Sequence, residues 1–195
     1  MRANMKSWLR RNGVDFYWRL QIPFLANALP TQLPNSVLFV CKGNICRSPF
    51  AEHLASKLAA QYGLTKMTIA SAGLRVLRPL SPPEESIAAA RAFGLDLSQH
   101  RSRSLDEMEV NNFHMIIVME PFQLRALCRA FPGARKKVWL LTAFDNKKQI
   151  SNHDAPRHAI PDPFGKTQVE FDACFKRIES CIVHFFSILN ACPCD

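Results

Sequence analysis

The chain has 195 residues, of which 48% are hydrophobic, and a formal net charge of +9. This composition is typical of one folded domain with a substantial core and excludes a mainly disordered chain. No apolar run approaches the roughly 18 residues of a membrane-spanning helix, and the N-terminus shows no signal peptide. The positive charge fits an acidic partner, such as a phosphate ester, a nucleic acid or an anionic membrane, without choosing among them.

The chain contains seven cysteines, which is an odd number. Without a signal peptide, this count indicates reduced thiols in the cytoplasm rather than a disulfide framework. A chemically active thiol is therefore one hypothesis for function.

Residues 1–35 combine basic and aromatic side chains and end in a proline-containing stretch. We predict an N-terminal extension with a short helix, followed by a linker. The extension could contact a membrane surface or a partner, or pack on the domain, and the residues leave this open. The folded domain is predicted to span residues 36–190, and residues 191–195 a loose tail that contains Cys192 and Cys194.

Short apolar runs alternate with helical patterns beyond residue 36. The runs predict buried strands at residues 36–40, 67–70, 115–119 and 138–141. The helical patterns predict helices at residues 49–62, 82–93, 121–130 and from 167 onward. Ser48 is the predicted N-cap of the first helix, and Thr167 and Glu170 form a capping box before the last. This alternation predicts an α/β fold of three layers, with a four-stranded parallel sheet and helices on both faces.

The segment 41–48 directly follows the first predicted strand and contains a cysteine, five residues and an arginine. Ligands of parallel α/β folds bind at the carboxyl ends of the strands, which is where Cys41 falls. Arg47 offers a planar fork of donors to phosphate oxygens, and Gly43 allows a tight turn of inward-pointing N–H groups. The N-terminus of the next helix adds to the same anion site. These positive groups would keep Cys41 ionised at neutral pH, and a thiolate can attack phosphorus.

Plainer interpretations exist for this segment and for a second candidate, Asp162. A cysteine and an arginine at this spacing also occur by chance in a buried strand-to-helix turn. Asp162 has a proline on either side, which would fix a carboxyl group able to protonate a leaving phenolate, but an ordinary proline turn looks the same. The nearby residues His153, Asp154 and His158 match no metal-ligand spacing, so we predict a polar loop with Asp154 as a reserve candidate for the acid.

Residues 37–49 resemble the signature of the low-molecular-weight protein tyrosine phosphatase family almost throughout. Other segments similar to this family are residues 71–73, 100–103, 116–119 and 162–165. The resemblance covers roughly residues 36–190. It implies hydrolysis of phosphotyrosine through a cysteinyl-phosphate intermediate, with no cofactor and no metal. The implied partners are tyrosine-phosphorylated proteins, with a tyrosine kinase as one candidate, and no nucleic acid is expected.

The resemblance also implies the catalytic roles. Cys41 would be the nucleophile, and Arg47 would clamp the phosphate. Asp162 would be the general acid that protonates the leaving tyrosine oxygen, and then the base for the attacking water.

The resemblance implies further roles within the phosphate-binding loop. Asn44 would hold the loop in shape, and Ser48 would donate its hydroxyl to the thiolate. Cys46 matches a second family cysteine, which could form a protective disulfide with the nucleophile. The remaining residues of the loop are Lys42, Gly43 and Ile45.

Three positions depart from the family pattern. Leu77 stands where an aromatic wall residue is common, and Phe164 replaces a common tyrosine, so we predict a pocket wall of Phe164 and Leu77. Lys42 stands where an apolar residue is usual. At the rim of the pocket, Lys42 predicts a preference for acidic residues beside the phosphotyrosine.

Three other functions remain as alternatives. An arsenate reductase of the same fold would need relay cysteines where this chain has Glu120 and Leu127, and Cys128 has no partner at the strand end. A phosphoarginine phosphatase is similar in this loop but has a threonine where this chain has Ile45. A non-catalytic phosphate-binding module would not need a nucleophile, a clamp and an acid together.

Overall fold

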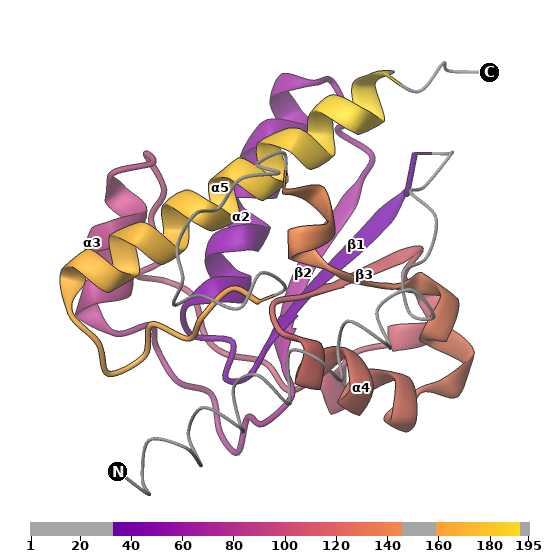
Figure 1. Cartoon of the computed structure of the whole chain (residues 1–195), viewed down its shortest axis with the longest axis horizontal. Coiled ribbons are helices and arrows are strands. Elements are labelled where there is room, and N and C mark those ends of the chain that lie inside the picture. Colours follow the sequence, from indigo (N-terminus) through magenta and orange to yellow (C-terminus); the bar gives the residue numbers. More distant parts are fainter. Residues whose placement is uncertain (1–32, 146–158, 192–195) are drawn as a thin grey trace, which may run out of the picture.

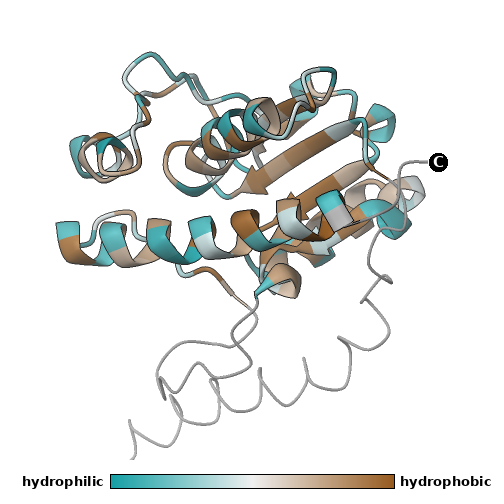
Figure 2. Cartoon of the chain, turned by 90° about the horizontal axis from the view of Figure 1, so that it is seen from above, coloured by the Kyte–Doolittle hydropathy of each residue, from teal (hydrophilic) through white to brown (hydrophobic). Residues whose placement is uncertain are grey.

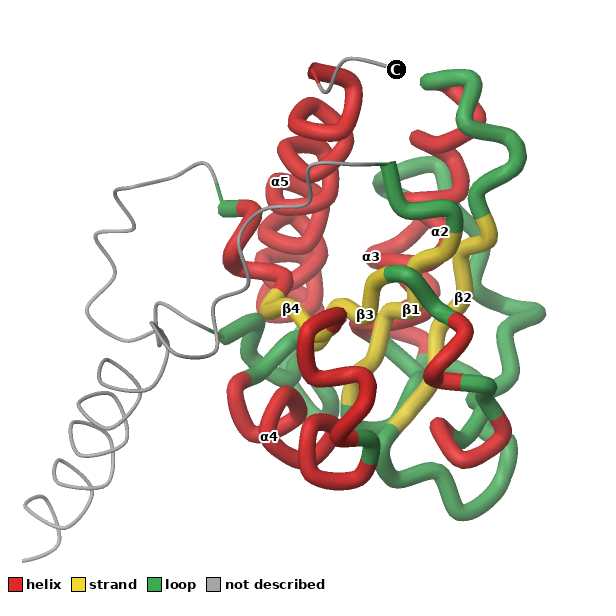
Figure 3. Tube along the Cα trace, turned by 90° about the vertical axis from the view of Figure 1, so that its right-hand side faces the viewer, coloured by secondary structure: helices red, strands yellow, loops and turns green. Residues whose placement is uncertain are grey.

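The computed structural model describes residues 33–145 and 159–191. The predicted helix of the N-terminal extension, the polar residues His153, Asp154 and His158, and the cysteines of the C-terminal tail lie outside these residues. The described part contains a single sheet of parallel strands in the order β2-β1-β3-β4 (Figure 3). The strands are β1 (Ser36–Cys41), β2 (Thr68–Gly73), β3 (Met115–Val118) and β4 (Val138–Leu140).

The strands form because their residues are apolar and suited to burial on both faces of a sheet. All four residues of β3 are buried, as are the last five of β1. Alternate side chains of β1 point to opposite faces. Val37 and Phe39 therefore belong to one hydrophobic core, whereas Leu38 and Val40 belong to another.

Helices cover both faces of the sheet (Figure 1). On one face, α2 and α5 pack together, with the ring of Phe50 stacked on that of Phe175 at 4.0 Å between centroids. On the other face, α4 covers the second core through Leu124 and Leu127. Figure 2 shows the strands as mainly hydrophobic and the helices as mixed in character. The helices are α2 (Arg47–Gln61), α3 (Glu84–Arg91), α4 (Pro121–Ala130) and α5 (Gln168–Ala191).

The predicted three-layer α/β fold is therefore confirmed. The helices begin and end within two residues of the predicted positions; for α5 only the beginning was predicted. One half of the predicted capping box before α5 is present, because Glu170 Oε2 accepts the N–H of Thr167 at 3.0 Å; the hydroxyl of Thr167 donates to the same oxygen, and the N–H of Glu170 donates to the carbonyl of Thr167 at 3.0 Å. The predicted N-cap at Ser48 is wrong: Cys46 is the N-cap of α2, with no capping side chain. Within the described ranges, no helix is long and apolar enough to cross a membrane.

Candidate active site

The loop between β1 and α2 lies at the carboxyl edge of the sheet and encloses the sulfur of Cys41. The N–H of Asn44 donates to Cys41 Sγ at 3.2 Å, and the hydroxyl of Ser48 donates to it at 3.0 Å. This second contact explains why Ser48 does not cap the helix: its hydroxyl is used by the sulfur. Two hydrogen-bond donors thus converge on one buried sulfur.

Asn44 fixes the shape of this loop from inside. It is buried and has a positive φ of 53°, a conformation that asparagine tolerates better than most residues. Its side-chain nitrogen donates to Ser48 Oγ at 2.9 Å and Ser71 Oγ at 2.7 Å, and its Oδ1 accepts the N–H of Arg103 at 2.8 Å. The ring of His100 contacts the carbonyl oxygen of Asn44 at 2.9 Å. The loop is therefore held by β2 and by the segment after α3.

Arg47 is the most deeply buried charged residue of the site, with 1% of its surface exposed. Its Nη1 forms an ion pair with Glu120 and donates to the carbonyl of Ile160 at 2.9 Å, and its Nη2 lies 2.9 Å from Asp162 Oδ2. Burial acts to lower the pKa of this guanidinium, but Cys41, Asp162 and Glu120 together raise the pKa above its ordinary value. Its Nε is buried and has no hydrogen-bond partner among the described residues.

The loop that contains Asp162 is anchored just before that residue, to the sheet and to the last helix. The N–H of Ile160 donates to the carbonyl of Met119, at the end of β3, at 2.8 Å. From α5, Arg177 Nη1 donates to the carbonyl of Ala159 at 2.7 Å. The sheet and the last helix thus place Asp162 against Arg47, although the two residues are far apart in the sequence.

Cys46 has a different environment from Cys41 in the same loop. Burial, and then the charge of Cys41, raise the pKa of the Cys46 thiol well above its ordinary range. Cys46 is therefore a protonated thiol at neutral pH. The five cysteines within the described ranges are all free, so the disulfide implied for Cys46 is not formed in this state.

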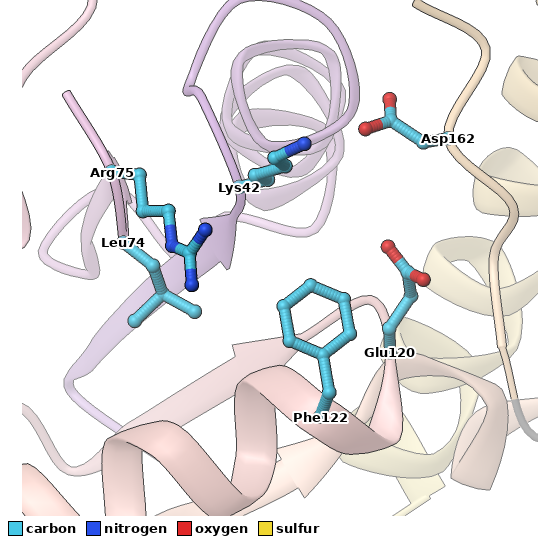
Figure 4. A pocket seen from close by; sticks show the side chains of 6 residues that line it. All are labelled: Lys42, Leu74, Arg75, Glu120, Phe122 and Asp162. Carbon is cyan, nitrogen blue, oxygen red and sulfur yellow. The ribbon is translucent and has the colours of Figure 1, made fainter.

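A pocket of about 330 Å³ opens above this site (Figure 4). Its lining residues are Lys42, Leu74, Arg75, Glu120, Phe122 and Asp162. Arg75 and Leu74 lie at one end and Glu120 and Asp162 at the other; Lys42 and Phe122 lie between them, with the amine of Lys42 directed toward the side of Asp162. The pocket is therefore apolar on parts of two sides and charged at both ends.

Neither Leu77 nor Phe164, the predicted pocket wall, is among the residues that line this pocket. After β2 ends, the N–H of Leu74 donates to the carbonyl of Cys41 at 3.0 Å, which brings Leu74 to the pocket and leaves Leu77 fully exposed. Phe164 donates its N–H to Asp162 Oδ1 at 3.3 Å, and its ring is 59% exposed and outside the lining. Leu74 and Phe122 provide the apolar walls instead.

Sequence reasoning missed three of the lining residues, Leu74, Arg75 and Phe122, and also the pairing of Glu120 with Arg47. One signal was available, because Glu120 follows β3 directly, and residues at the carboxyl ends of parallel strands gather at the ligand site. Phe122 and Arg75 carry no comparable signal. In the part of the chain that the structure describes, no group of His, Cys, Asp and Glu side chains could hold a metal ion.

The fold and the site together define a class: an α/β protein with an anion-binding loop between its first strand and the following helix. The chain belongs to the low molecular weight phosphotyrosine protein phosphatase family, whose model matches residues 36–192. It is therefore a phosphoric monoester hydrolase of the protein tyrosine phosphatase type, as the resemblance predicted.

Individual relatives agree with this assignment. The low molecular weight protein-tyrosine-phosphatase Wzb of Salmonella typhi is 31% identical over 157 residues, which are 80% of this chain and 95% of the relative. The crystal structure of Wzb from Escherichia coli K30 in complex with sulphate superposes with a TM-score of 0.68 at 29% identity, over 80% of this chain and 99% of that one. The arginine phosphatase YwlE has a TM-score of 0.69 over 80% of this chain and 96% of its own, but at 23% identity it shows the shared fold alone.

Proposed function

We propose that this phosphatase hydrolyses phosphotyrosine in proteins through a cysteinyl-phosphate intermediate, with Cys41 as nucleophile, Arg47 as phosphate clamp and Asp162 as general acid. One observation supports this most strongly. A sulfur with two converging hydrogen-bond donors, a buried guanidinium and a carboxylate 2.9 Å from that guanidinium meet at one edge of the sheet. We also place the protein in the cytoplasm, where free thiols such as its described cysteines persist.

In the first step, the thiolate of Cys41 attacks phosphorus and the bond from phosphorus to the tyrosine oxygen breaks. The loop N–H groups and the guanidinium of Arg47 stabilise the charge on the transferring oxygens. The buried, unpartnered Nε of Arg47 supports this role, because a phosphate oxygen would satisfy it. Asp162 gives its proton to the departing tyrosine oxygen, which leaves as a neutral phenol.

In the second step, Asp162 is a carboxylate and removes a proton from a water molecule. That water attacks phosphorus, the bond from sulfur to phosphorus breaks, and inorganic phosphate leaves. The hydroxyl of Ser48, 3.0 Å from the sulfur, stabilises the thiolate that departs. Atoms and charges then return to the starting state, with no cofactor involved.

The alternatives gain no support from the site. An arsenate reductase needs a relay cysteine near the end of β3, but the residue there is Glu120, which is paired with Arg47. Ile45 is half-buried in the loop, and its bulk favours a flat aromatic ring over the guanidinium of phosphoarginine. These residues favour phosphotyrosine as the substrate.

The test is hydrolysis of p-nitrophenyl phosphate by the wild type, Cys41→Ser and Asp162→Ala. We expect Cys41→Ser to lose nearly all activity and Asp162→Ala to lose roughly 10²- to 10⁴-fold in kcat, the usual contribution of a general acid. Cys128→Ser, which changes a cysteine on α4 away from the loop, is the matched control and should retain wild-type activity. Full activity in Cys41→Ser would rule out the mechanism.

A further inference from the structure

Two positively charged side chains at the pocket have no partner among the residues that the structure describes. Lys42 and Arg75 are both exposed, and neither side chain makes a hydrogen bond or an ion pair with any described residue. The two carboxylates of the same pocket, Glu120 and Asp162, do have a partner, because both are paired with Arg47. The charged groups of the pocket that remain available to a ligand are therefore positive.

The backbone fixes these two cations next to each other and next to the nucleophile. The N–H of Arg75 donates to the carbonyl of Lys42 at 2.9 Å, and the preceding N–H, of Leu74, donates to the carbonyl of Cys41 at 3.0 Å. The segment after β2 is thus docked on the segment after β1. Figure 4 shows Lys42 beside the middle of the pocket and Arg75 at the end away from the carboxylates.

We propose that Lys42 and Arg75 select phosphotyrosine that has glutamate or aspartate on its flanks, so that the substrate class is an acidic phosphorylated segment. This inference rests on the proposed function. A tyrosine ring that delivers its phosphate to Cys41 passes between Leu74 and Phe122, and the flanking peptide emerges at the rim. The carboxylates of that peptide would there find the two unpaired cations, with Arg78 exposed on the same segment after β2.

The cations could instead serve only the phosphate group. Arg47 and the loop N–H groups already surround that group, so Lys42 and Arg75 are not needed to complete its coordination. Lys42 and Arg75 line the pocket above the phosphate site, where the tyrosine ring and the flanking peptide of the substrate would lie. The distinction can be measured, because attraction to phosphate alone would favour every phosphotyrosine peptide equally.

The experiment compares two phosphotyrosine peptides that differ only in glutamate or glutamine at the positions flanking the phosphotyrosine. For the wild type, we expect kcat/KM to be roughly 5- to 20-fold higher for the glutamate peptide, the gain expected from two exposed ion pairs. In the double variant Lys42→Gln/Arg75→Gln this ratio should fall close to one. Raising the salt from about 0.05 M to about 0.5 M should lower the wild-type ratio, because exposed charge pairs are screened.

The matched control is Lys66→Gln/Lys176→Gln, which removes two exposed cations outside the pocket lining and should keep the wild-type ratio. Equal rates for the two peptides in the wild type would overturn the inference. If kcat/KM of the double variant fell by the same factor on both peptides, the inference would also be overturned, since the cations would then bind only the phosphate group. Failure of the proposed function looks different: the wild type would hydrolyse neither peptide.

Discussion

Glu120 forms an ion pair with Arg47. The proposed hydrolysis of phosphotyrosine gives this residue no direct chemical role. It also accepts a hydrogen bond from Gln123 Nε2 at 3.2 Å, so the first turn of α4 fixes its carboxylate. It thereby orients the guanidinium toward the loop. We infer that it is a positioning residue, which acts through Arg47.

Glu120→Gln should lower kcat for p-nitrophenyl phosphate roughly tenfold, because a charge-assisted hydrogen bond to the guanidinium becomes a weaker neutral one. Cys41 would keep its contacts, so labelling of Cys41 by iodoacetate should continue at the wild-type rate. Glu109→Gln, at an exposed position outside the site, is the control. Wild-type kcat in Glu120→Gln would show that Arg47 needs no second carboxylate.

Ser48 is the second residue with a measurable role. Ser48→Ala removes a hydroxyl that lies 3.0 Å from Cys41 Sγ, and we expect inactivation by iodoacetate at about pH 6.5 to slow several-fold, since a hydrogen bond to an ionised group contributes about 1.5–3 kcal/mol. Turnover should fall with it. Ser56→Ala, at an exposed site on the same helix, should change neither rate. Unchanged inactivation in Ser48→Ala would contradict the proposed support of the thiolate.

His100 makes stability depend on pH. Burial lowers the pKa of its ring, although the contact with the carbonyl of Asn44 acts in the opposite direction. Between that lowered pKa and the ordinary value of 6.5, the unfolded chain binds more protons than the folded one, so stability rises with pH across this window. His100→Gln should reduce the gain in stability measured by urea unfolding between about pH 5 and about pH 7. His184→Gln is the control, and an identical gain in both variants would argue against this role.

At the scale of elements, the end of β2 supports the phosphate-binding loop directly. A Cβ atom at Gly73 would lie 2.6 Å from Val76 Cγ2 and 3.0 Å from both Asn44 N and Gly43 C. Only glycine allows this approach, so the position of β2 sets that of the loop.

Gly73→Ala should therefore push the loop away from its geometry and lower kcat/KM for p-nitrophenyl phosphate by more than about tenfold, with a loss of stability of about 1–3 kcal/mol from overpacking. Gly133→Ala offers a matched control, because the nearest atom to its added Cβ is Asn111 Oδ1 at 3.7 Å, an ordinary contact. If Gly73→Ala retained full activity, the loop would not depend on β2.

The elements themselves could be predicted from local sequence. Apolar runs of strand length and apolar residues at helical spacing depend on near neighbours, so β3 and α4 are found where they were expected. The course of the chain after β2 could not be predicted, because it depends on a hydrogen bond between Leu74 and Cys41 that no local pattern encodes. Local sequence therefore indicated Leu77 for the wall, whereas Leu74 is the residue that lines the pocket and Leu77 is exposed.

At the scale of the whole molecule, the site combines segments from β1, β2, β3 and the loop before α5. Sequence reasoning predicted Cys41 from the strand, loop and helix around it, and a family resemblance connected Asp162 to the same site. The pairing of Glu120 with Arg47 had no such guide, since 73 positions separate the two residues and only the packed sheet brings them together. Contacts of this range are a property of the fold.

All of these segments lie within residues 33–145 and 159–191, and the family match begins at residue 36. A chain that starts at residue 33 should therefore hydrolyse p-nitrophenyl phosphate with a kcat/KM within about twofold of the full chain, because no change in transition-state contacts is expected. The comparison tests the predicted domain boundary. A large loss in the shortened chain would mean that residues 1–32 contribute to folding or to the site.

The contacts of Arg47 with two carboxyl groups affect both the binding of substrate and the release of product. The guanidinium is paired with Asp162 and Glu120, and Asp162 must be protonated to act as the general acid, so we expect an incoming phosphate monoester to replace the Asp162 contact and leave the Glu120 contact in place. After hydrolysis, the Asp162 carboxyl group can lose its proton and pair with the guanidinium again, and this contact competes with inorganic phosphate and favours its departure.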